Sequence, residues 1–411
     1  MNPAIVIGLD CITGLQVARL LDARGVPVIG VARRPHHFAC RTRACRRVLV
    51  ADTAGEALVE ALVRLGPTLE APGVLYPCTD AAVRQVSLHR EALRPWYLFA
   101  LPDHDTVEML MDKARFYAFA RQHGLPVPAT LLLHSRREAA DAARQLTFPC
   151  LLKPTLKTPT WERATKAKAF RVTSPDELLA LYDRCARWAD TLMVQEWVEG
   201  PDHNLYSCNA YFDAGSRPLA TFVSRKLRQW PIKTGTSCLG VACRHDTLLE
   251  TTVRLFRLAR FHGLAYLEMK QDARTGRHLI IEPNVGRPTG RSVIAEAGGV
   301  ELHLTMYCDL TGRPLPARRA QDDRRITWVY LRRDLQASAA YWRRGELTPG
   351  EWWRSLRGPK VFAVWSPRDP VPFFLDVWQT AQGAARAWLR SLAGRLRPRG
   401  RPAPQAPHHT G

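Results

Sequence analysis

The chain has 411 residues, 46% hydrophobic and 24% charged, so it is long enough for two or three domains and has the composition of a folded globular protein. Its 59 basic and 38 acidic residues give a formal net charge of +21, which favours anionic partners such as nucleotides, nucleic acid or an anionic membrane surface. We expect no secretory leader, because the first residues lack a basic segment followed by a long apolar run, and no apolar run reaches the roughly 18 residues of a membrane span. Ten cysteines stand singly without a C-x-x-C motif, so we expect reduced thiols in a cytoplasmic protein rather than a zinc site.

The first hundred residues alternate between apolar strands and amphipathic helices. Strand 4–8 leads through a tight turn into a helix and then into strand 26–31, which together form a βαβ unit. Gly8 and Gly14 bracket the turn, but the dinucleotide fingerprint G-x-G-x-x-G is absent, which argues against NAD. Residues 1–105 are therefore predicted to form a Rossmann-like α/β domain.

Residues 106–192 form a second region, which begins with a helix that Gly124 and Pro126 end. A short apolar strand follows and ends at Lys153. After it comes a polar loop, 154–168, that carries threonines and lysines. Lysines and backbone N–H groups in such a position can meet phosphate oxygens, so the region predicts an anion site.

Residues 193–317 contain the clearest chemical pattern. One apolar strand ends at Glu268, and after a turn-like segment the next strand ends in Glu282 and Asn284. Residues i and i+2 of a strand lie on one face, so the oxygens of Glu282 and Asn284 point the same way. A hairpin of this length places Glu268 beside Glu282, and three hard oxygen ligands suit Mg²⁺.

Residues 318–411 are rich in tryptophan and arginine, with a helix expected near 334–344. The final segment has six arginines between 386 and 401 and no acid after Asp376. Two interpretations stay open: a helix lying on an anionic membrane at its inner face, or a helix packed on the body and followed by a basic tail. The apolar residues of this segment fall at helical spacing: Trp378, Ala381, Ala385, Trp388, Leu389, Leu392 and Leu396.

The order of these motifs resembles the ATP-grasp superfamily of carboxylate–amine ligases. The order is D-K at 112–113, K-P at 153–154, Q-E-W-V-E-G-P-D at 195–202, E-M-K at 268–270 and E-P-N at 282–284. The resemblance covers residues 106 to 312. It is strongest to the predicted carboxylate–amine ligases, in which the last motif often reads E-P-x-x-G-R and K-L-R-Q-x-P recurs upstream, here as R-K-L-R-Q-W-P.

The resemblance implies an α/β fold of three parts. A Rossmann-like preATP-grasp domain would span 1–105, and an ATP-grasp domain would span 106–317. The ATP-grasp domain would divide into subdomains 106–192 and 193–317, the second with the metal site. A C-terminal extension, 318–411, would carry a basic amphipathic helix and a disordered tail.

The resemblance also implies roles for particular residues. Lys113 and Lys153 would contact the ATP phosphates, and Arg287 would stabilise the transferring phosphoryl group or the acyl-phosphate. The remaining expected contacts are the hinge that hydrogen-bonds adenine (Glu196, Trp197 and Val198), the acid that holds the ribose (Asp202), and the ligands of Mg²⁺, or alternatively Mn²⁺ (Glu268, Glu282 and Asn284).

Three basic residues near the K-L-R-Q motif, Lys226, Arg228 and Lys233, are candidates for binding an anionic acceptor, and the alternative is a solvated basic strand edge. Two positions depart from the family pattern. Arg287 stands three residues after Asn284, where many members have arginine two residues after, and the loop 154–168 lacks a glycine-rich run.

The implied reaction starts when a small-molecule carboxylate attacks the γ-phosphorus of ATP and releases ADP. An amine then displaces phosphate from the acyl-phosphate and forms an amide. One alternative is an ATP-grasp enzyme with another nucleophile, such as bicarbonate or a thiol. A nucleic-acid-binding protein is disfavoured because the arginine-rich run 33–47 has no interleaved aromatic residue beyond Phe38. An inactive ATP-binding module is disfavoured by the intact metal-ligand set.

Overall fold

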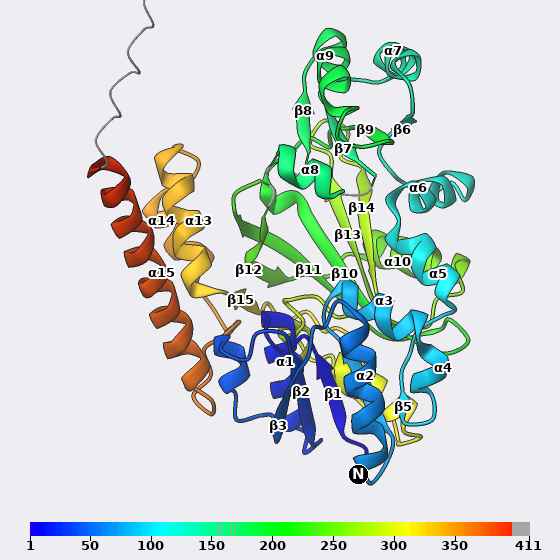
Figure 1. Cartoon of the computed structure of the whole chain (residues 1–411), viewed down its shortest axis with the longest axis vertical. Coiled ribbons are helices and arrows are strands. Elements are labelled where there is room, and N and C mark those ends of the chain that lie inside the picture. Colours follow the sequence, from blue (N-terminus) through cyan, green and yellow to red (C-terminus); the bar gives the residue numbers. More distant parts are fainter. Residues whose placement is uncertain (156–157, 166, 168, 234, 397–411) are drawn as a thin grey trace, which may run out of the picture.

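Three β-sheets and the helices that cover them build the fold (Figure 1). The computed structural model describes residues 1–155, 158–165, 167, 169–233 and 235–396. The α/β class expected from the sequence is confirmed.

The first sheet has five parallel strands in the order β3-β2-β1-β4-β5. Strands β1, β2 and β4 are buried along their whole length, as parallel strands covered on both faces must be. The strands are β1 (Ala4–Ile7), β2 (Val28–Ala32), β3 (Arg47–Val50), β4 (Gly73–Pro77) and β5 (Tyr97–Leu98). The helices are α1 (Ile12–Asp22), η1 (Phe38–Arg41), α2 (Glu56–Leu65), η2 (Gly66–Thr68), α3 (Asp80–Leu88) and α4 (Arg90–Leu93).

The helix expected after residue 106 is two helices, α5 (His104–Met111) and α6 (Lys113–Gln122). The break occurs because the Asp112 side chain caps α6, accepting a hydrogen bond from the backbone N–H of Arg115 at 2.8 Å. Lys113 is consequently the first residue of α6.

The second sheet has four antiparallel strands in the order β6-β9-β7-β8. Its strands are β6 (Thr130–Leu133), β7 (Cys150–Pro154), β8 (Phe170–Val172) and β9 (Leu192–Glu196), and its helices are α7 (Arg136–Gln145), α8 (Pro159–Ala164) and α9 (Pro175–Cys185). The boundary expected at 192/193 falls inside β9, which pairs with both β6 and β7 and therefore belongs to this sheet. The predicted phosphate loop, 154–168, contains the short helix α8, whose Trp161 side chain is buried. Residues 156, 157, 166 and 168 of this loop lie outside the described residues.

The third sheet has seven strands in the order β14-β13-β10-β11-β12-β15-β16. Its strands are β10 (Leu205–Phe212), β11 (Pro218–Trp230), β12 (Thr236–Ala242), β13 (Gly263–Gln271), β14 (His278–Val285), β15 (Thr327–Val329) and β16 (Lys360–Phe362). The helices between them are η3 (Asp202–Asn204), α10 (Asp246–Leu258), α11 (Val293–Ala297) and α12 (Leu302–Leu310). The segment after residue 317 was expected as an extension, yet β15 pairs with β12, so this segment continues the sheet.

Three further helices of the C-terminal segment lie along one side of the molecule (Figure 1). They are α13 (Leu331–Arg343), α14 (Pro349–Ser355) and α15 (Val371–Leu396). Among the helices that the structure describes, none combines the length and apolarity needed to cross a membrane.

Candidate active site

Two carboxylates face each other on neighbouring strands of the third sheet. Glu268 on β13 lies directly opposite Glu282 on β14, and Asn284 lies opposite Tyr266. Directly opposite residues of an antiparallel pair share a face, so the predicted hairpin geometry is confirmed. Two carboxylates and a carboxamide form a hard oxygen set that fits Mg²⁺. Asn284 would use its Oδ1 for the cation, because its amide nitrogen, which is buried without a hydrogen-bond partner among the described residues, is a donor and cannot bind a metal.

The two carboxylates have opposite electrostatic surroundings. Burial alone would raise the pKa of Glu268, but the Lys226 ammonium 2.8 Å away, with Arg291 and Arg287 beyond it, holds the pKa below its usual range. Glu282 opens onto the cleft. Loss of solvation there, and then the Glu268 carboxylate, raise the pKa of Glu282. A bound divalent cation would offset the repulsion between them.

Two lysines lie on the other side of this cleft. Lys113, at the start of α6, lines a cavity of about 120 Å³ together with Glu282 and Asn284. Lys153 lies on β7, where its ammonium donates to Gln195 Oε1 at 3.0 Å. Burial, and then the positive charge of Lys113, lower the pKa of Lys153 to about 8, while Glu282 opposes the shift. A phosphate group between the lysines would remove their repulsion, so their placement fits the predicted role.

The apparent affinity for ATP should therefore depend on pH through Lys153. In the nucleotide-free protein this lysine is protonated below about pH 8, and above that pH phosphate binding must be accompanied by proton uptake. We expect the Kd for ATP to rise with pH above about 8, approaching tenfold per pH unit. Isothermal titration calorimetry between about pH 7 and about pH 10 measures this slope.

Two arginine variants control this prediction. Lys153→Arg should flatten the slope because a guanidinium stays charged throughout that range. Lys113→Arg retains Lys153 and should keep the slope. If both variants followed the parent curve, Lys153 would not be the titrating group.

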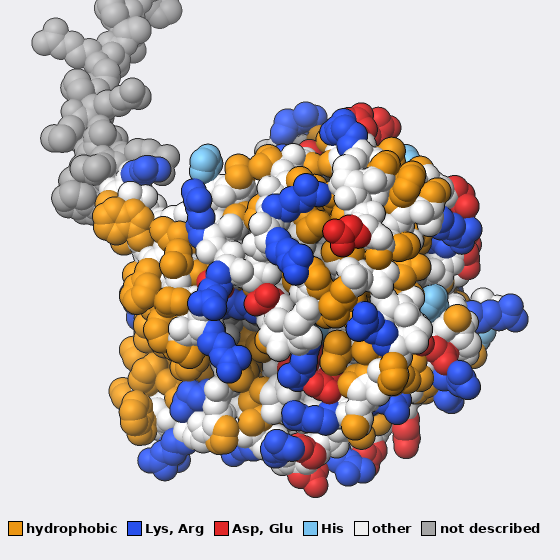
Figure 2. All heavy atoms as spheres, turned by 90° about the horizontal axis from the view of Figure 1, so that it is seen from below, with side chains coloured by type: hydrophobic (Ala, Val, Ile, Leu, Met, Phe, Trp, Pro, Cys, Tyr) orange, Lys and Arg blue, Asp and Glu red, His pale blue; other side chains and the backbone are white. Residues whose placement is uncertain are grey.

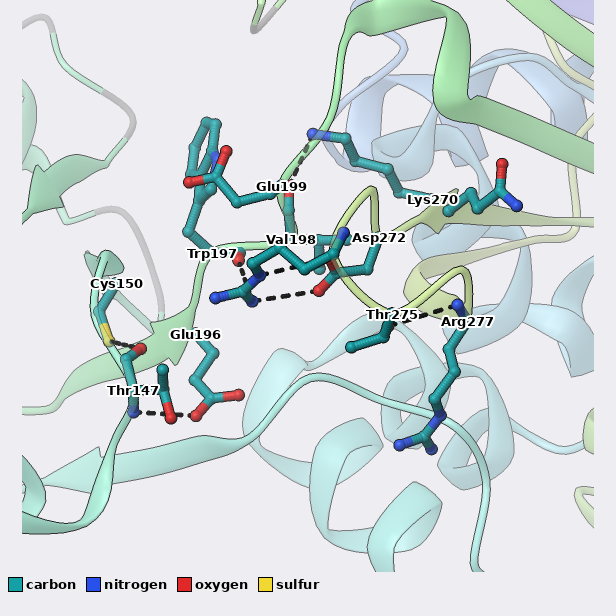
Figure 3. A network of polar contacts seen from close by, with 12 residues as sticks. Thr147, Cys150, Glu196, Trp197, Val198, Glu199, Lys270, Asp272, Thr275 and Arg277 are labelled. Carbon is teal, nitrogen blue, oxygen red and sulfur yellow. Dashed lines mark hydrogen bonds and ion pairs between the residues drawn. The ribbon is translucent and has the colours of Figure 1, made fainter.

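The hinge between the second and third sheets contains Trp197 and Val198. Lys270 on β13 donates to the Val198 carbonyl at 2.7 Å, and its ammonium lies 5.2 Å from the centre of a Trp197 ring (Figure 3). Trp197, Lys270 and Asp202 border a cavity of about 1040 Å³. This cavity is large enough for a nucleoside, which agrees with the hinge prediction.

The side chain of Glu196 lies on the opposite face of β9 from the cleft. Its carboxylate accepts a hydrogen bond from the Thr147 backbone N–H at 3.0 Å, and it is paired with Cys150 on β7 (Figure 3). Gln195 instead faces the cleft and bonds Lys153. At the predicted hinge, this strand therefore presents the Gln195 side chain to the cleft, and Glu196 can contribute its backbone to an adenine contact.

Asp202 borders the large cavity and already has protein partners. Its carboxylate accepts from the backbone N–H of Lys233 at 3.0 Å and from the Tyr341 hydroxyl of α13. The C-terminal segment thus reaches the residue predicted to hold the ribose, a contact that the motif order did not reveal.

Arg228, a predicted contact for an anionic acceptor, is paired with an acid inside the protein. Its Nε and Nη2 donate to the two carboxylate oxygens of Asp334 on α13, at 2.7 and 3.0 Å, and its Nη1 donates to Ser355 Oγ at 2.9 Å. The pair is buried, with side-chain exposures of 6% and 0%. Because Asp334 neutralises this charge inside the protein, Arg228 holds α13 against β11 and is not a free cation for an anionic acceptor. Lys226, two residues earlier, does reach the site through Glu268.

Arg287 reaches the metal-ligand set in spite of its displaced spacing. Gly286 has a φ of +69°, and a Cβ there would lie 2.6 Å from the Leu101 side chain, so only glycine allows this turn. The turn brings the Arg287 guanidinium back to Asn284 Oδ1 at 2.6 Å and to the Tyr266 hydroxyl at 2.9 Å. The extra residue between Asn284 and Arg287 is thus absorbed by the glycine.

Arg291 lies beside Glu268, and the motif comparison did not single it out. It is 5% exposed and donates to Ser207 Oγ at 2.7 Å, and its Nε has no partner among the described residues. Burial lowers the pKa of Arg291, and the nearby Glu268 carboxylate opposes that shift. A buried arginine with free hydrogen-bonding capacity beside the metal-ligand set is suited to an anionic substrate group. The only sequence signal is its position four residues after Arg287.

Known proteins share both sequence and fold with the chain. D-aspartate ligase of Enterococcus faecium is 24% identical over 228 residues, which cover 53% of this chain and 54% of that protein. D-alanine–D-alanine ligase of Ectopseudomonas mendocina is 26% identical over 47% of this chain and 62% of that protein. The chain thus spans somewhat more than half the length of these curated relatives. No protein-family model matches it.

Solved structures with the same fold are more distant in sequence. Biotin carboxylase from Campylobacter jejuni superposes with a TM-score of 0.61 at 14% identity, over 77% of this chain and 73% of that one. N5-carboxyaminoimidazole synthetase from Staphylococcus aureus, complexed with ADP, superposes with a TM-score of 0.61 at 14% identity, over 78% and 79%. The chain therefore shares its fold with these enzymes and part of its sequence with the two ligases, in agreement with the resemblance to ATP-grasp ligases that the motif order indicated.

Proposed function

We propose that the protein is an ATP- and Mg²⁺-dependent ligase that activates a small-molecule carboxylate as an acyl-phosphate and joins it to an amine. The observation that carries this proposal is the direct pairing of Glu268 with Glu282, in a cleft that also contains Lys113 and Lys153. The relatives support it, since their names are those of enzymes that join amino acids. D-aspartate and D-alanine are therefore the first carboxylates to test.

The residues of the chain divide the work of the reaction. Lys113 and Lys153 hold phosphate oxygens of ATP, while Lys226 keeps Glu268 ionised and oriented. Glu268, Glu282 and Asn284 would hold Mg²⁺, or Mn²⁺, which neutralises phosphate charge when bound. Arg287 stabilises the negative charge of the transferring phosphoryl group.

Arg291 is proposed to bind the substrate carboxylate beside these groups. Replacing it with methionine, which keeps an unbranched apolar stem and has no charge, should raise the KM for the carboxylate by roughly tenfold or more, because a charge-assisted hydrogen bond is lost. The KM for ATP should stay the same, and Arg291→Lys should recover part of the loss. Steady-state kinetics with each substrate varied in turn tests this. An unchanged carboxylate KM in Arg291→Met would contradict it.

A panel assay tests the reaction type. The protein is incubated with Mg-ATP, one carboxylate at a time and hydroxylamine as a general amine, and both ADP and hydroxamate are measured. We expect the two products in equal amounts for the true carboxylate. ADP formed with bicarbonate or a thiol, and without hydroxamate from any carboxylate, would favour the alternative nucleophile.

We also propose that the enzyme works in the cytoplasm, peripheral to the inner face of the membrane. All ten cysteines are free thiols in the structure, and most are buried, which supports a reducing compartment. The membrane part of this proposal depends on the last helix.

A further inference from the structure

The last helix, α15 (Val371–Leu396), turns polar residues toward the body of the protein. Asp376 is 3% exposed and pairs with Arg332 of α13 at 2.9 Å. Three residues later, the Gln379 side chain donates to the His36 carbonyl of the first domain at 2.7 Å. The helix is therefore attached to the body through hydrogen bonds and an ion pair.

The outer face of α15 is apolar. Phe374 and Trp378 are each 61% exposed, Val371 is 50% exposed and Val377 is 47% exposed. Their spacing of three and four residues makes one stripe along the helix. Figure 2 shows hydrophobic side chains gathered on the left side of the molecule, where Figure 1 places α15. A helix that served only to cover the body would bury such a stripe, so this surface is expected to meet a partner.

The sequence continues the stripe and adds positive charge to it. Ala381 and Ala385 are exposed at the same spacing. Beyond them the pattern is continued by residues whose side chains lie outside the described part: Trp388, Leu389, Leu392 and Leu396. The chain has no acid after Asp376 and six arginines between 386 and 401. The segment thus combines aromatic and leucine residues with arginines and carries no negative charge.

We propose that this outer face of α15 docks the protein on an anionic lipid bilayer, with the helix lying in the plane of the interface. The exposed Trp378 and Phe374 side chains would bury into the headgroup region, and arginines are attracted by anionic lipids. A second copy of the chain is a poorer partner, because pairing would bring two acid-free arginine clusters together on molecules of net charge +21. Membrane docking does not depend on the ligase reaction, and the experiment below measures vesicle binding alone.

Vesicle co-sedimentation of the full chain tests the docking. The chain should sediment with vesicles that contain phosphatidylglycerol and remain in solution with phosphatidylcholine alone. The double variant Phe374→Glu, Trp378→Glu should weaken binding to the anionic vesicles by roughly tenfold or more, since it places two charges in the buried stripe. Both residues are exposed, so the fold should tolerate the change.

A matched double variant separates the surface from the net charge. Val63→Glu, Leu88→Glu makes the same charge change at exposed apolar residues of α2 and α3, and it should bind within about twofold of the parent. The docking would be overturned if the parent did not sediment with anionic vesicles, or if both double variants lost vesicle binding equally. It would also be overturned if the parent formed a dimer in solution and did not bind vesicles, and the α15 variant dissociated that dimer.

Discussion

Replacing Glu282 by glutamine should lower ATP turnover by roughly a hundredfold or more, because the cleft would lose one of the two charged side chains that we propose hold Mg²⁺. The substitution keeps the shape of the side chain and its place opposite Glu268. The measurement is ADP release at saturating ATP and substrate. Full turnover in the variant would refute the site.

The same substitution should leave the folded protein at least as stable as before. Loss of solvation in the cleft, and then the Glu268 carboxylate, raise the pKa of Glu282 above its value in the unfolded chain. The ionised form at neutral pH is therefore less favourable in the folded protein and opposes folding. A neutral glutamine removes that repulsion. We expect the thermal midpoint, measured with EDTA, to be equal to that of the parent or higher. The matched control is Glu250→Gln on the surface of α10, which should change neither turnover nor stability.

Replacing Asp334 by asparagine should cost about 3–5 kcal/mol of the free energy of unfolding, because Arg228 would remain buried without a counter-charge. Asp334 also accepts a hydrogen bond from the Trp352 indole at 3.0 Å, so the loss extends to α14. Urea unfolding followed by circular dichroism measures the difference.

Two variants show whether burial is the reason. Arg228→Met combined with Asp334→Leu removes both charges and should recover most of the stability, since an apolar pair needs no counter-charge. Asp183→Asn breaks an exposed pair with Arg136, whose side-chain exposures are 48% and 62%, and should cost less than about 1 kcal/mol. A small effect of Asp334→Asn would mean that water reaches Arg228.

The pairing of Glu268 with Glu282 was predictable because its geometry is local. A hairpin fixes which residues are opposite each other, and Glu268 and Glu282 lie within one hairpin. The Rossmann-like sheet was predictable for a similar reason, since its buried parallel strands are continuous apolar runs.

The side chain that the predicted adenine hinge presents to the cleft was harder to predict, because neighbouring residues of one strand alternate between its two faces. Gln195 and Glu196 point to opposite faces, and only the pairing of β9 with β7 decides which one faces the cleft. The sequence contains no local signal for that choice. The motif order placed Glu196 in the hinge, and the structure shows that the neighbouring Gln195 side chain faces the cleft.

Long-range partners could not be predicted at all. Arg228 forms an ion pair with Asp334, which is 106 residues away in the sequence. Asp202 accepts a hydrogen bond from Tyr341, which is 139 residues away. Both partners lie in the C-terminal segment, which continues the third sheet through β15 and β16. Short motifs say nothing about which distant segment covers a strand edge.

The outward apolar stripe of α15 was visible in the sequence as a periodic pattern, but its direction was not. Periodicity shows that one face is apolar, and it does not show whether that face meets the body or the surroundings. The contacts of Asp376 and Gln379 decide this for the first half of the helix.

The most direct test of the central claim follows an oxygen atom. The carboxylate found in the panel assay is labelled with ¹⁸O at both oxygens and reacted with Mg-ATP and the amine. If the carboxylate attacks the γ-phosphorus, one labelled oxygen stays on phosphorus when the amine displaces it, so each phosphate released should carry a single ¹⁸O. Release of ADP with unlabelled phosphate would contradict the acyl-phosphate route and with it the assignment of the protein as a carboxylate–amine ligase.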